Sequence, residues 1–160
     1  MTMRKGAVIL AAGAGMRLGG VAKALLAAGG GRTFLSQILA TAREVGLDRA
    51  IVVVGPPFAE EVAAHAVDLG GEVVVNPHPE RGMATSVALG FAAIAGTAPK
   101  MEGPEFTSRP GIDAAWLWPV DHPDVKPATL REIERVLGAH AAARPTVGAR
   151  GGHPPLITRA

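Results

Sequence analysis

The sequence predicts an α/β fold, a Rossmann-like three-layer sandwich in which helices cover both faces of a mainly parallel sheet. Short apolar runs alternate with longer helical runs along the chain, which is the spacing that βαβ units produce. Residues 51–54 and 73–75 are apolar at every position, which indicates strands buried on both faces. A length of 160 residues suits a single domain, 1–160.

The first part of the chain carries three expected strand–helix pairs. Thr33 is the expected N-cap of the first helix, and Gly46 and Gly70 are expected to follow the ends of the first two helices. The elements in order are a strand at 6–12, a helix at 32–45, a strand at 50–54, a helix at 59–69, a strand at 72–76 and a helix at 84–95.

The second part of the chain is less regular. Residues 96–112 contain three prolines and three glycines, which predicts a surface excursion rather than a domain boundary. A strand at 114–120 and a helix at 127–143 follow, and the helix begins with a proline, as first turns allow. Residues 145–149 are predicted to form a fifth strand, whereas the pattern of residues 154–160 is ambiguous.

Composition excludes several classes of protein. The chain has no cysteine, so disulfides and thiolate metal sites are ruled out and any metal must be held by oxygen or imidazole ligands. The formal net charge is only +2, which does not indicate a general nucleic-acid binder. No stretch approaches the ~20 apolar residues of a membrane span. We therefore expect a cytoplasmic protein with no membrane or nucleic-acid partner.

Three loops at strand ends mark the expected ligand site. Gly13, Asn76 and Asp121 each follow a predicted strand. Because ligands bind beyond the carboxyl ends of strands in such sheets, these three loops should converge there. Residues 13–23 add glycines, which let backbone amides approach a phosphate chain, and the cations Arg17 and Lys23.

The glycine loop matches neither of two common phosphate-binding motifs. It lacks the Gly-Lys-Ser/Thr of a P-loop, and Leu18 stands where the dinucleotide fingerprint needs its third glycine. From the residues alone, the loop is an anion site or a flexible turn with two solvated basic side chains.

Residues 10–23, Leu-Ala-Ala-Gly-x-Gly-x-Arg-Leu-Gly followed by Lys23, resemble the signature of the MobA-like nucleotidyltransferases. Those proteins handle the molybdenum cofactor, and the short Arg17-to-Lys23 spacing without proline favours that branch. The resemblance implies a nucleotide-diphospho-sugar transferase-like fold in which Arg17 and Lys23 neutralise a triphosphate and act as catalytic residues. It implies nucleotide binding by Leu10, Ala11, Ala12, Gly13, Gly15, Arg17 and Lys23.

The resemblance extends along the chain. Residues 75–77 and 82–86 are similar to the family segment that packs on the nucleoside, which implies roles in nucleotide binding for Asn76 and Ser86. Thr85 and Ser86 also begin a predicted helix, where hydroxyls and free amides can meet a polar ligand, although an ordinary helix start reads the same way.

Residues 117–123 resemble the family strand that ends in an acidic metal ligand, here Asp121, whose alternative role is to form a turn before Pro123. Mg²⁺ needs only one or two protein carboxylates when phosphates and water complete its shell, so Asp121 is the expected catalytic Mg²⁺ ligand, with Asp124 as a helper. His122, which stands where family members more often have glutamine, is expected on the acceptor side with Gly152 and His153.

The expected reaction moves a nucleoside monophosphate to a phosphorylated acceptor and releases pyrophosphate. The Ala11-Ala12-Gly13 sequence resembles members that use CTP rather than GTP, so CMP is the expected group and a molybdopterin-type compound the expected acceptor. One alternative is a sugar- or alditol-phosphate nucleotidyltransferase. Another is a nucleotide-binding accessory protein for molybdoenzyme maturation that does not turn over. A homo-oligomer or a molybdoenzyme partner fits either scheme.

The family pattern continues beyond this sequence, with a further helix and an edge strand that often bears a second acidic ligand. The chain ends at Ala160, so we expect it to be shortened at the C-terminus. Residues 151–160 should then be exposed, with an edge that is poorly ordered or paired with another chain, and transfer should be slower than nucleotide affinity would suggest. Trp116 and Trp118 are expected core anchors, and His65 and His140 expected surface residues.

Overall fold

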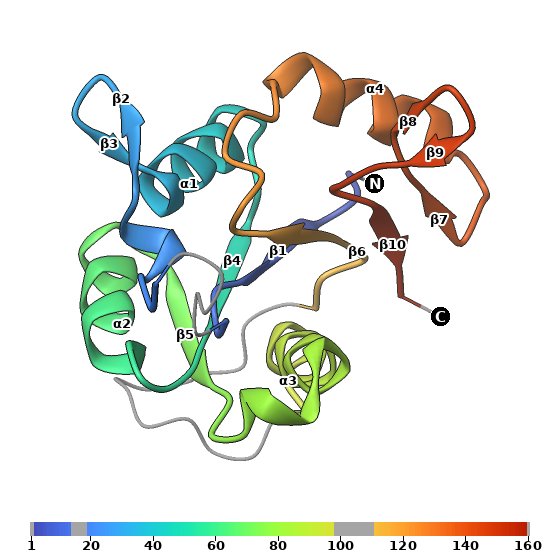
Figure 1. The fold of residues 1–160 in the computed structure, drawn as a ribbon. Coiled ribbons are helices and arrows are strands. Elements are labelled where there is room, and N and C mark those ends of the chain that lie inside the picture. Colours follow the sequence, from blue (N-terminus) through green and yellow to red (C-terminus); the bar gives the residue numbers. More distant parts are fainter. Residues whose placement is uncertain (1, 14–18, 98–110, 160) are drawn as a thin grey trace.

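The computed structural model describes residues 2–13, 19–97 and 111–159, and these form a six-stranded sheet with helices on both faces (Figure 1). The strand order is β5-β4-β1-β6-β10-β7. The strands are β1 (Lys5–Leu10), β4 (Arg49–Val54), β5 (Glu72–Val75), β6 (Ala114–Pro119), β7 (Ala142–Ala143) and β10 (Leu156–Thr158). The first four of these pair in parallel, and β10 runs antiparallel to β6 and to β7.

Four α-helices connect the strands: α1 (Phe34–Glu44), α2 (Ala59–Asp68), α3 (Met83–Ala95) and α4 (Pro127–Leu137). One buried cluster joins α1, α2 and α4 to one face of the sheet, and a second joins α3 to the other face. Figure 1 shows α3 on the opposite side of the sheet from α1 and α4. The predicted three-layer α/β sandwich with a mainly parallel sheet is therefore confirmed.

Alternation along β1 explains how one strand serves both clusters. Ala7 and Ile9 face the α1, α2 and α4 side, whereas Val8 and Leu10 face α3. All four side chains are no more than 9% exposed. Successive side chains of a strand point to opposite faces, so an unbroken apolar run is what a doubly covered strand requires.

Short elements complete the chain. They are the 3₁₀ helices η2 (Lys23–Leu25) and η3 (Pro79–Arg81), the hairpin of β2 (Ala27–Gly29) with β3 (Arg32–Thr33), and the hairpin of β8 (Thr146–Val147) with β9 (Arg150–Gly151). Thr33 caps α1 as predicted: its hydroxyl accepts a hydrogen bond from the Ser36 amide, and the Ser36 hydroxyl accepts one from the Thr33 amide. This reciprocal pair satisfies two amides at the helix start.

The first seven predicted elements, from the strand at 6–12 to the strand at 114–120, each lie within two residues of their observed limits. Two later predictions are confirmed only in part, by α4 and by the short β8 (Thr146–Val147). The helix predicted at 127–143 ends at Leu137, because Gly138 takes a left-handed φ of 49° that stops the helix. The strand predicted at 145–149 does not join the main sheet, because Thr146–Val147 turns back onto Arg150–Gly151.

The expectation that residues 151–160 are exposed, with an edge poorly ordered or paired with another chain, is wrong for residues 156–158. Leu156 is fully buried and lies opposite Trp116 in the pairing of β10 with β6. An antiparallel strand therefore covers the edge of β6, and a buried leucine makes that pairing part of the core.

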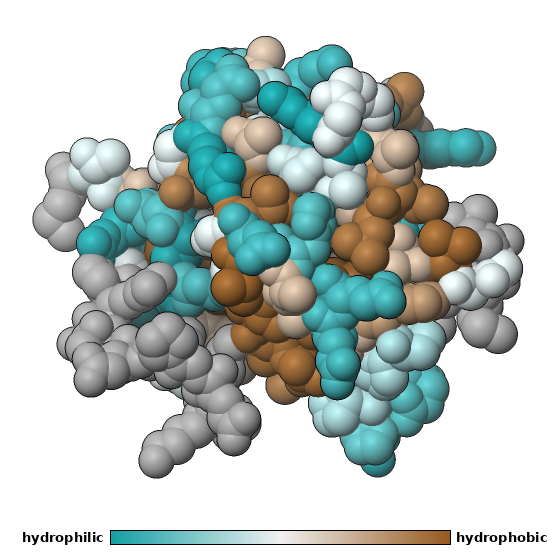
Figure 2. All heavy atoms as spheres, turned by 90° about the vertical axis from the view of Figure 1, so that its left-hand side faces the viewer, coloured by the Kyte–Doolittle hydropathy of each residue, from teal (hydrophilic) through white to brown (hydrophobic). Residues whose placement is uncertain are grey.

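The face on the side of α1, α2 and β5 carries apolar surface at its centre, bordered by hydrophilic surface (Figure 2). Val67 of α2 is 61% exposed and Val75 of β5 is 51% exposed. Strand β5 is also the last strand of the sheet on this side. The sheet thus ends here in an edge with partly apolar surroundings.

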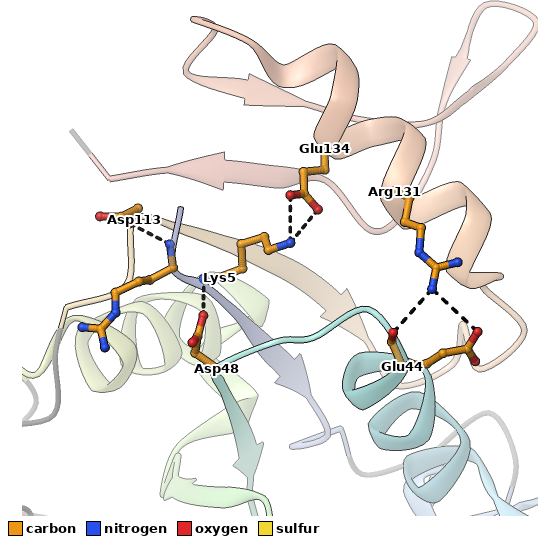
Figure 3. Close-up of polar contacts among 7 residues, drawn as sticks. Lys5, Glu44, Asp48, Asp113, Arg131 and Glu134 are labelled. Carbon is orange, nitrogen blue, oxygen red and sulfur yellow. Dashed lines mark hydrogen bonds and ion pairs between the residues drawn. The ribbon is translucent and has the colours of Figure 1, made fainter. Parts of the chain in front are cut away.

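Polar contacts join α1, α4 and the sheet at the amino ends of the parallel strands (Figure 3). The Lys5 ammonium donates to both carboxylate oxygens of Glu134 on α4 at 2.8 and 2.7 Å. The Asp48 carboxylate accepts from the Lys5 amide at 2.8 Å, and Arg131 of α4 contacts Glu44 of α1 at 3.8 Å. These contacts fix α4 to the sheet at the end away from the converging loops.

Candidate functional site

The carboxyl ends of β1, β4, β5 and β6 converge through backbone hydrogen bonds. The Ala11 amide donates to Val53, the Asn76 amide to Val54 and the Val120 amide to Leu10, at 2.8, 2.7 and 3.0 Å. The three loops singled out by the sequence are therefore brought to one edge of the sheet. Parallel topology explains this, since all these strands end at the same edge.

Gly55 permits this close approach, and sequence reasoning missed it. A Cβ at position 55 would lie 2.9 Å from the Asn76 carbonyl oxygen and 3.1 Å from the Ala12 Cβ. The first distance is shorter than real Cβ contacts and the second is tighter than most of them, so glycine lets the loops after β1 and β5 approach the end of β4 this closely. The Gly55-Pro56-Pro57 run marked a strand end in the sequence but gave no sign of this contact.

A cavity of about 220 Å³ opens between these loops. Its walls combine backbone of the first loop, two charged side chains and the start of α3. Among the described residues the lining consists of Leu10, Ala11, Ala12, Gly13, Lys23, Pro79, Met83, Ser86, Pro119, Val120 and Asp121. Seven of the predicted site residues belong to this set: Leu10, Ala11, Ala12, Gly13, Lys23, Ser86 and Asp121.

Gly13 leaves a space that a side chain would fill. A Cβ built at this position meets no heavy atom of the described residues within 4 Å. Its φ lies outside the left-handed region, so the backbone does not itself require glycine. The space at Gly13 is therefore a cradle that lets a ligand approach the main chain. Gly15 and Arg17 lie outside the described residues.

Lys23 and Asp121 face each other at the cavity. The ammonium of Lys23, on η2, lies 3.6 Å from the Asp121 carboxylate, and the two side chains are 33% and 49% exposed. An exposed pair at this distance is weak, because water screens it and both side chains lose freedom. A polyanion and a cation could therefore take over the two partners at small cost.

The turn that carries Asp121 is held at both sides of His122. The His122 amide donates to the Pro119 carbonyl at 3.1 Å, and the His122 carbonyl accepts from the Trp118 indole at 2.8 Å. The His122 Nε2 lies 3.7 Å from Asp121. Trp116 and Trp118 are 1% and 0% exposed, so the prediction that both anchor the core is confirmed.

The acceptor-side residues predicted from the sequence also lie together. The rings of His122 and His153 have centroids 5.3 Å apart and are inclined by 30°. The Gly152 amide is bonded to the Pro145 carbonyl at 2.8 Å, which holds the chain just before His153. His122 and His153, 31 positions apart in sequence, thereby lie together beside Asp121.

Asn76 supports the cavity wall. Its amide nitrogen donates to the hydroxyls of Thr85 and Ser86, each at 2.9 Å, and its oxygen accepts from the His78 amide at 3.0 Å. Asn76 is 2% exposed and is not part of the cavity lining given above. The geometry therefore favours a role in placing Ser86 over direct contact with a ligand.

Other titratable side chains near these loops have partners elsewhere. Asp124, the expected helper, accepts from the Gln37 amide of α1 at 3.2 Å. His78 lies 3.0 Å from Glu80, and the pKa of Glu80 is held below its usual value first by a hydrogen bond to its own backbone amide. His65, expected at the surface, is half-buried and bonded to the Thr33 hydroxyl at 2.8 Å.

The donor set at the cavity suits an oxygen-seeking cation that shares its shell with a ligand. Residues 2–13, 19–97 and 111–159 contain no group of three His, Asp or Glu side chains arranged to hold a metal. Asp121 offers one carboxylate at the cavity. Mg²⁺ is usually bound by one or two carboxylates plus phosphate oxygens, so a single aspartate fits that mode.

No helix of the described ranges is both long enough and apolar enough to cross a membrane.

Solved structures with the same fold include proteins clearly related in sequence. Rv0371c from Mycobacterium tuberculosis H37Rv is 31% identical with a TM-score of 0.73, over 99% of this chain and 73% of that chain. A structure of that protein in complex with manganese gives 28% identity and a TM-score of 0.67, over 99% of this chain and 72% of that chain.

Two curated proteins match as well. A bifunctional protein GlmU from Azorhizobium caulinodans is 32% identical over 148 residues, 92% of this chain and 30% of that protein. A bifunctional IPC transferase and DIPP synthase from Thermococcus kodakarensis is 35% identical over 94 residues, 56% of this chain and 21% of that protein. The chain thus spans less than a third of the length of these curated relatives.

The family assignment rests on almost the whole chain. The model of the MobA-like NTP transferase domain matches residues 7–160, from β1 through the cavity loops to the end of the chain. The solved relatives share the fold, and the matched region includes all the described cavity residues. The chain belongs to the MobA-like NTP transferase family, whose members are nucleotidyltransferases.

Proposed function

We propose that the protein transfers CMP from CTP to a phosphorylated small molecule, a molybdopterin-type compound, and releases pyrophosphate. One observation carries the proposal: the cavity between the strand ends combines a side-chain-free backbone at Gly13 with the facing charges of Lys23 and Asp121. Membership of the MobA-like family supports the reaction class. The Ala11-Ala12-Gly13 sequence supports CTP.

The reaction needs alignment of anions more than acid–base catalysis. An oxygen of the acceptor phosphate forms a bond to the α-phosphorus, the α–β bridging bond breaks, and its electron pair leaves with pyrophosphate. The acceptor is already ionised, so no general base is required. Positioning and charge neutralisation dominate such transfers.

Each described residue has a part in this scheme. Backbone at Gly13 accommodates the phosphate chain, and Lys23 turns from Asp121 to the β- and γ-phosphates. Ser86, held by Asn76, lies at the other wall with Met83 and contacts the nucleoside. His122 and His153 lie beside Asp121 and orient the acceptor phosphate.

Asp121 is the proposed ligand for a divalent cation, Mg²⁺, which when bound neutralises charge between the phosphates and the leaving pyrophosphate. The manganese complex of Rv0371c supports a divalent cation in the family. In this scheme the turn of residues 119–122 keeps the Asp121 carboxylate directed at the cavity.

The first test is a thermal-shift screen of the four nucleoside triphosphates with Mg²⁺. A nucleotide at 100 times its Kd stabilises the folded state by about 2.7 kcal/mol, and CTP should give the largest shift. A clear advantage for GTP would overturn the base assignment, and no shift with any nucleotide would overturn the proposal.

Lys23→Ala is the second test, with Arg150→Ala on the exposed β9 as a matched loss of charge. A charge-assisted hydrogen bond contributes about 1.5–3 kcal/mol, so we expect Lys23→Ala to weaken CTP binding about tenfold to a hundredfold. Isothermal titration measures both variants. Equal affinity of Lys23→Ala and Arg150→Ala for CTP would remove Lys23 from the site.

A sugar- or alditol-phosphate acceptor is the second candidate, and the curated relatives favour keeping it. Neither GlmU nor the IPC transferase and DIPP synthase is named for molybdenum chemistry. Pyrophosphate release with a panel of acceptors separates the two candidates. Binding of CTP without pyrophosphate release from any acceptor would instead support the non-catalytic accessory protein.

A further inference from the structure

Trp118 lies beneath the turn that carries Asp121. Its side chain is fully buried in the cluster that joins α1, α2 and α4 to the sheet. Its indole N–H lies at the edge of this cluster and donates a hydrogen bond to the His122 carbonyl at 2.8 Å. A buried ring with one polar atom is suited to this task, since its body packs while its N–H reaches a partner.

The side-chain contacts of Asp121 among the described residues are long ones, to Lys23 at 3.6 Å and to His122 Nε2 at 3.7 Å. The Pro119 carbonyl accepts from the His122 amide at 3.1 Å, so residues 119–122 form a closed turn with Asp121 inside it. The Asp121 side chain is 49% exposed, and its contact with Lys23 is 3.6 Å long. The direction of the carboxylate therefore depends on the backbone of the turn, and Trp118 fixes that backbone at the next peptide.

Trp116 provides the comparison within the same strand. It is two residues earlier on β6, belongs to the same buried cluster and is 1% exposed. Among the described residues its indole N–H is buried without a hydrogen-bond partner. The two tryptophans thus share burial and packing, and they differ in whether the indole holds the turn.

We propose that Trp118 is a positioning residue that sets the Asp121 carboxylate for the divalent cation and the α-phosphate. This inference rests on the proposed function. It predicts that Trp118 acts on the metal dependence of the reaction, whereas Trp116 contributes to stability alone.

Trp118→Phe and Trp116→Phe test the inference as a matched pair. Each removes one indole from the same face of β6. We expect Trp118→Phe to raise the Mg²⁺ concentration for half-maximal turnover roughly tenfold, the low end for groups that orient metal ligands. Its Kd for CTP without metal should equal that of Trp116→Phe, and the metal dependence of Trp116→Phe should match the unmodified protein.

A spectroscopic readout needs no turnover. The chain has only two tryptophans, so each variant leaves one indole as the sole emitter. Adding Mn²⁺ and CTP should change the emission of Trp118 in the Trp116→Phe protein. The emission of Trp116 in the Trp118→Phe protein should stay constant at the same ligand occupancy, which isothermal titration establishes.

The outcomes separate the two claims. If the unmodified protein binds no nucleoside triphosphate, the proposed function fails and this inference fails with it. If it binds Mn²⁺ and CTP but both variants show equal metal dependence, the inference alone is overturned. If Trp118→Phe does not fold, the emission of Trp118 in the Trp116→Phe protein decides, and an unchanged emission at saturating ligand refutes the inference.

Discussion

Gly13 and Gly55 lie on neighbouring loops at the same edge of the sheet, yet they lack a side chain for opposite reasons. A Cβ at Gly13 would enter open space, whereas a Cβ at Gly55 would press on the Asn76 carbonyl and the Ala12 side chain. One glycine leaves room for a ligand, and the other leaves room for the protein itself. Substitution with alanine separates these two uses.

Gly13→Ala should leave the thermal unfolding of the free protein unchanged and weaken CTP binding about tenfold or more. The added methyl displaces the phosphate chain from the backbone amides, and a hydrogen bond to a charged group contributes about 1.5–3 kcal/mol. Gly55→Ala should instead lower the free energy of unfolding by about 1–3 kcal/mol through overpacking. Calorimetric scans and CTP titrations of both variants check the contrast, and equal CTP affinity of Gly13→Ala and the unmodified protein would contradict it.

Asp121→Asn should abolish metal-dependent turnover while CTP binding without metal persists. The amide keeps the shape of the side chain but loses the charge that attracts Mg²⁺ and Lys23. Asp124→Asn is the matched control, because Asp124 contacts Gln37 rather than the cavity. Pyrophosphate release measures both variants, and normal release by Asp121→Asn would refute its role.

At the residue scale, loop positions at strand ends together with the family resemblance identified Lys23, Ser86 and Asp121, which all line the cavity. It did not identify Gly55 or the indole of Trp118, because their roles arise from contacts with other loops. Asn76 was selected for the nucleotide, but its side chain holds Thr85 and Ser86. A polar residue after a strand is visible in sequence, whereas the direction of its hydrogen bonds is set by the fold.

At the scale of elements, helix α3 places Ser86 at the cavity and depends on close packing against β1. A Cβ at Gly90 would collide with Val8 and lie 3.0 Å from a methyl of Val53. Gly6 likewise faces Ile94 of α3. Two glycines thus let the helix lie close against the sheet, and this packing positions the start of α3 at the cavity.

Gly90→Ala should destabilise the fold even though alanine favours helices. The gain in helix propensity is at most about 1 kcal/mol, while forcing a methyl into a filled core costs about 1–3 kcal/mol. We expect a net loss and a melting temperature lower by several degrees. Ala88→Ser on the exposed side of α3 is the control and should stay within about 0.5 kcal/mol. A Gly90→Ala protein as stable as this control would show that α3 can move outward freely.

Elements with local signals were predicted best. The capping box of Thr33 with Ser36 lies within four residues, so the start of α1 follows from neighbouring side chains. The antiparallel β10 could not be predicted in this way, because its three residues gain order only by pairing with β6 and β7. The early end of α4 did have a local cause in Gly138. The alanine-rich residues 139–143 nevertheless favoured a longer helix in the sequence.

At the scale of the whole molecule, the two ends of the sheet have different chemistry. The amino ends of the strands carry well-formed ion pairs and amide–carboxylate bonds, and the carboxyl ends carry glycines, hydroxyls and one loose pair. Stability and ligand binding should therefore respond to different substitutions.

Glu134→Gln tests this separation. Lys5 is 13% exposed and bonds both oxygens of Glu134, so loss of the charge should cost about 1.5–3 kcal/mol. The Kd for CTP should not change, because Lys5 begins β1 whereas the cavity lies at the other end of that strand. Glu132→Gln is the control: Arg135 lowers the pKa of Glu132 by a hydrogen bond, but the pair is exposed and should leave the melting temperature unchanged. A melting temperature of Glu134→Gln equal to that of Glu132→Gln would contradict the assignment of stability to this end.

In the free protein Lys23 and Asp121 are each other's counter-ions, and we expect both to exchange that partner for a ligand on binding. A polyanion that draws Lys23 away leaves Asp121 with an unbalanced charge, and a cation that binds Asp121 releases Lys23 for the polyanion. Triphosphate and metal should then bind with positive heterotropic linkage, each raising the affinity of the other by the same factor. Nucleotide titrations at low and high metal concentration measure that factor, and in Asp121→Asn it should become smaller, because only the direct contact between metal and triphosphate is left to couple them.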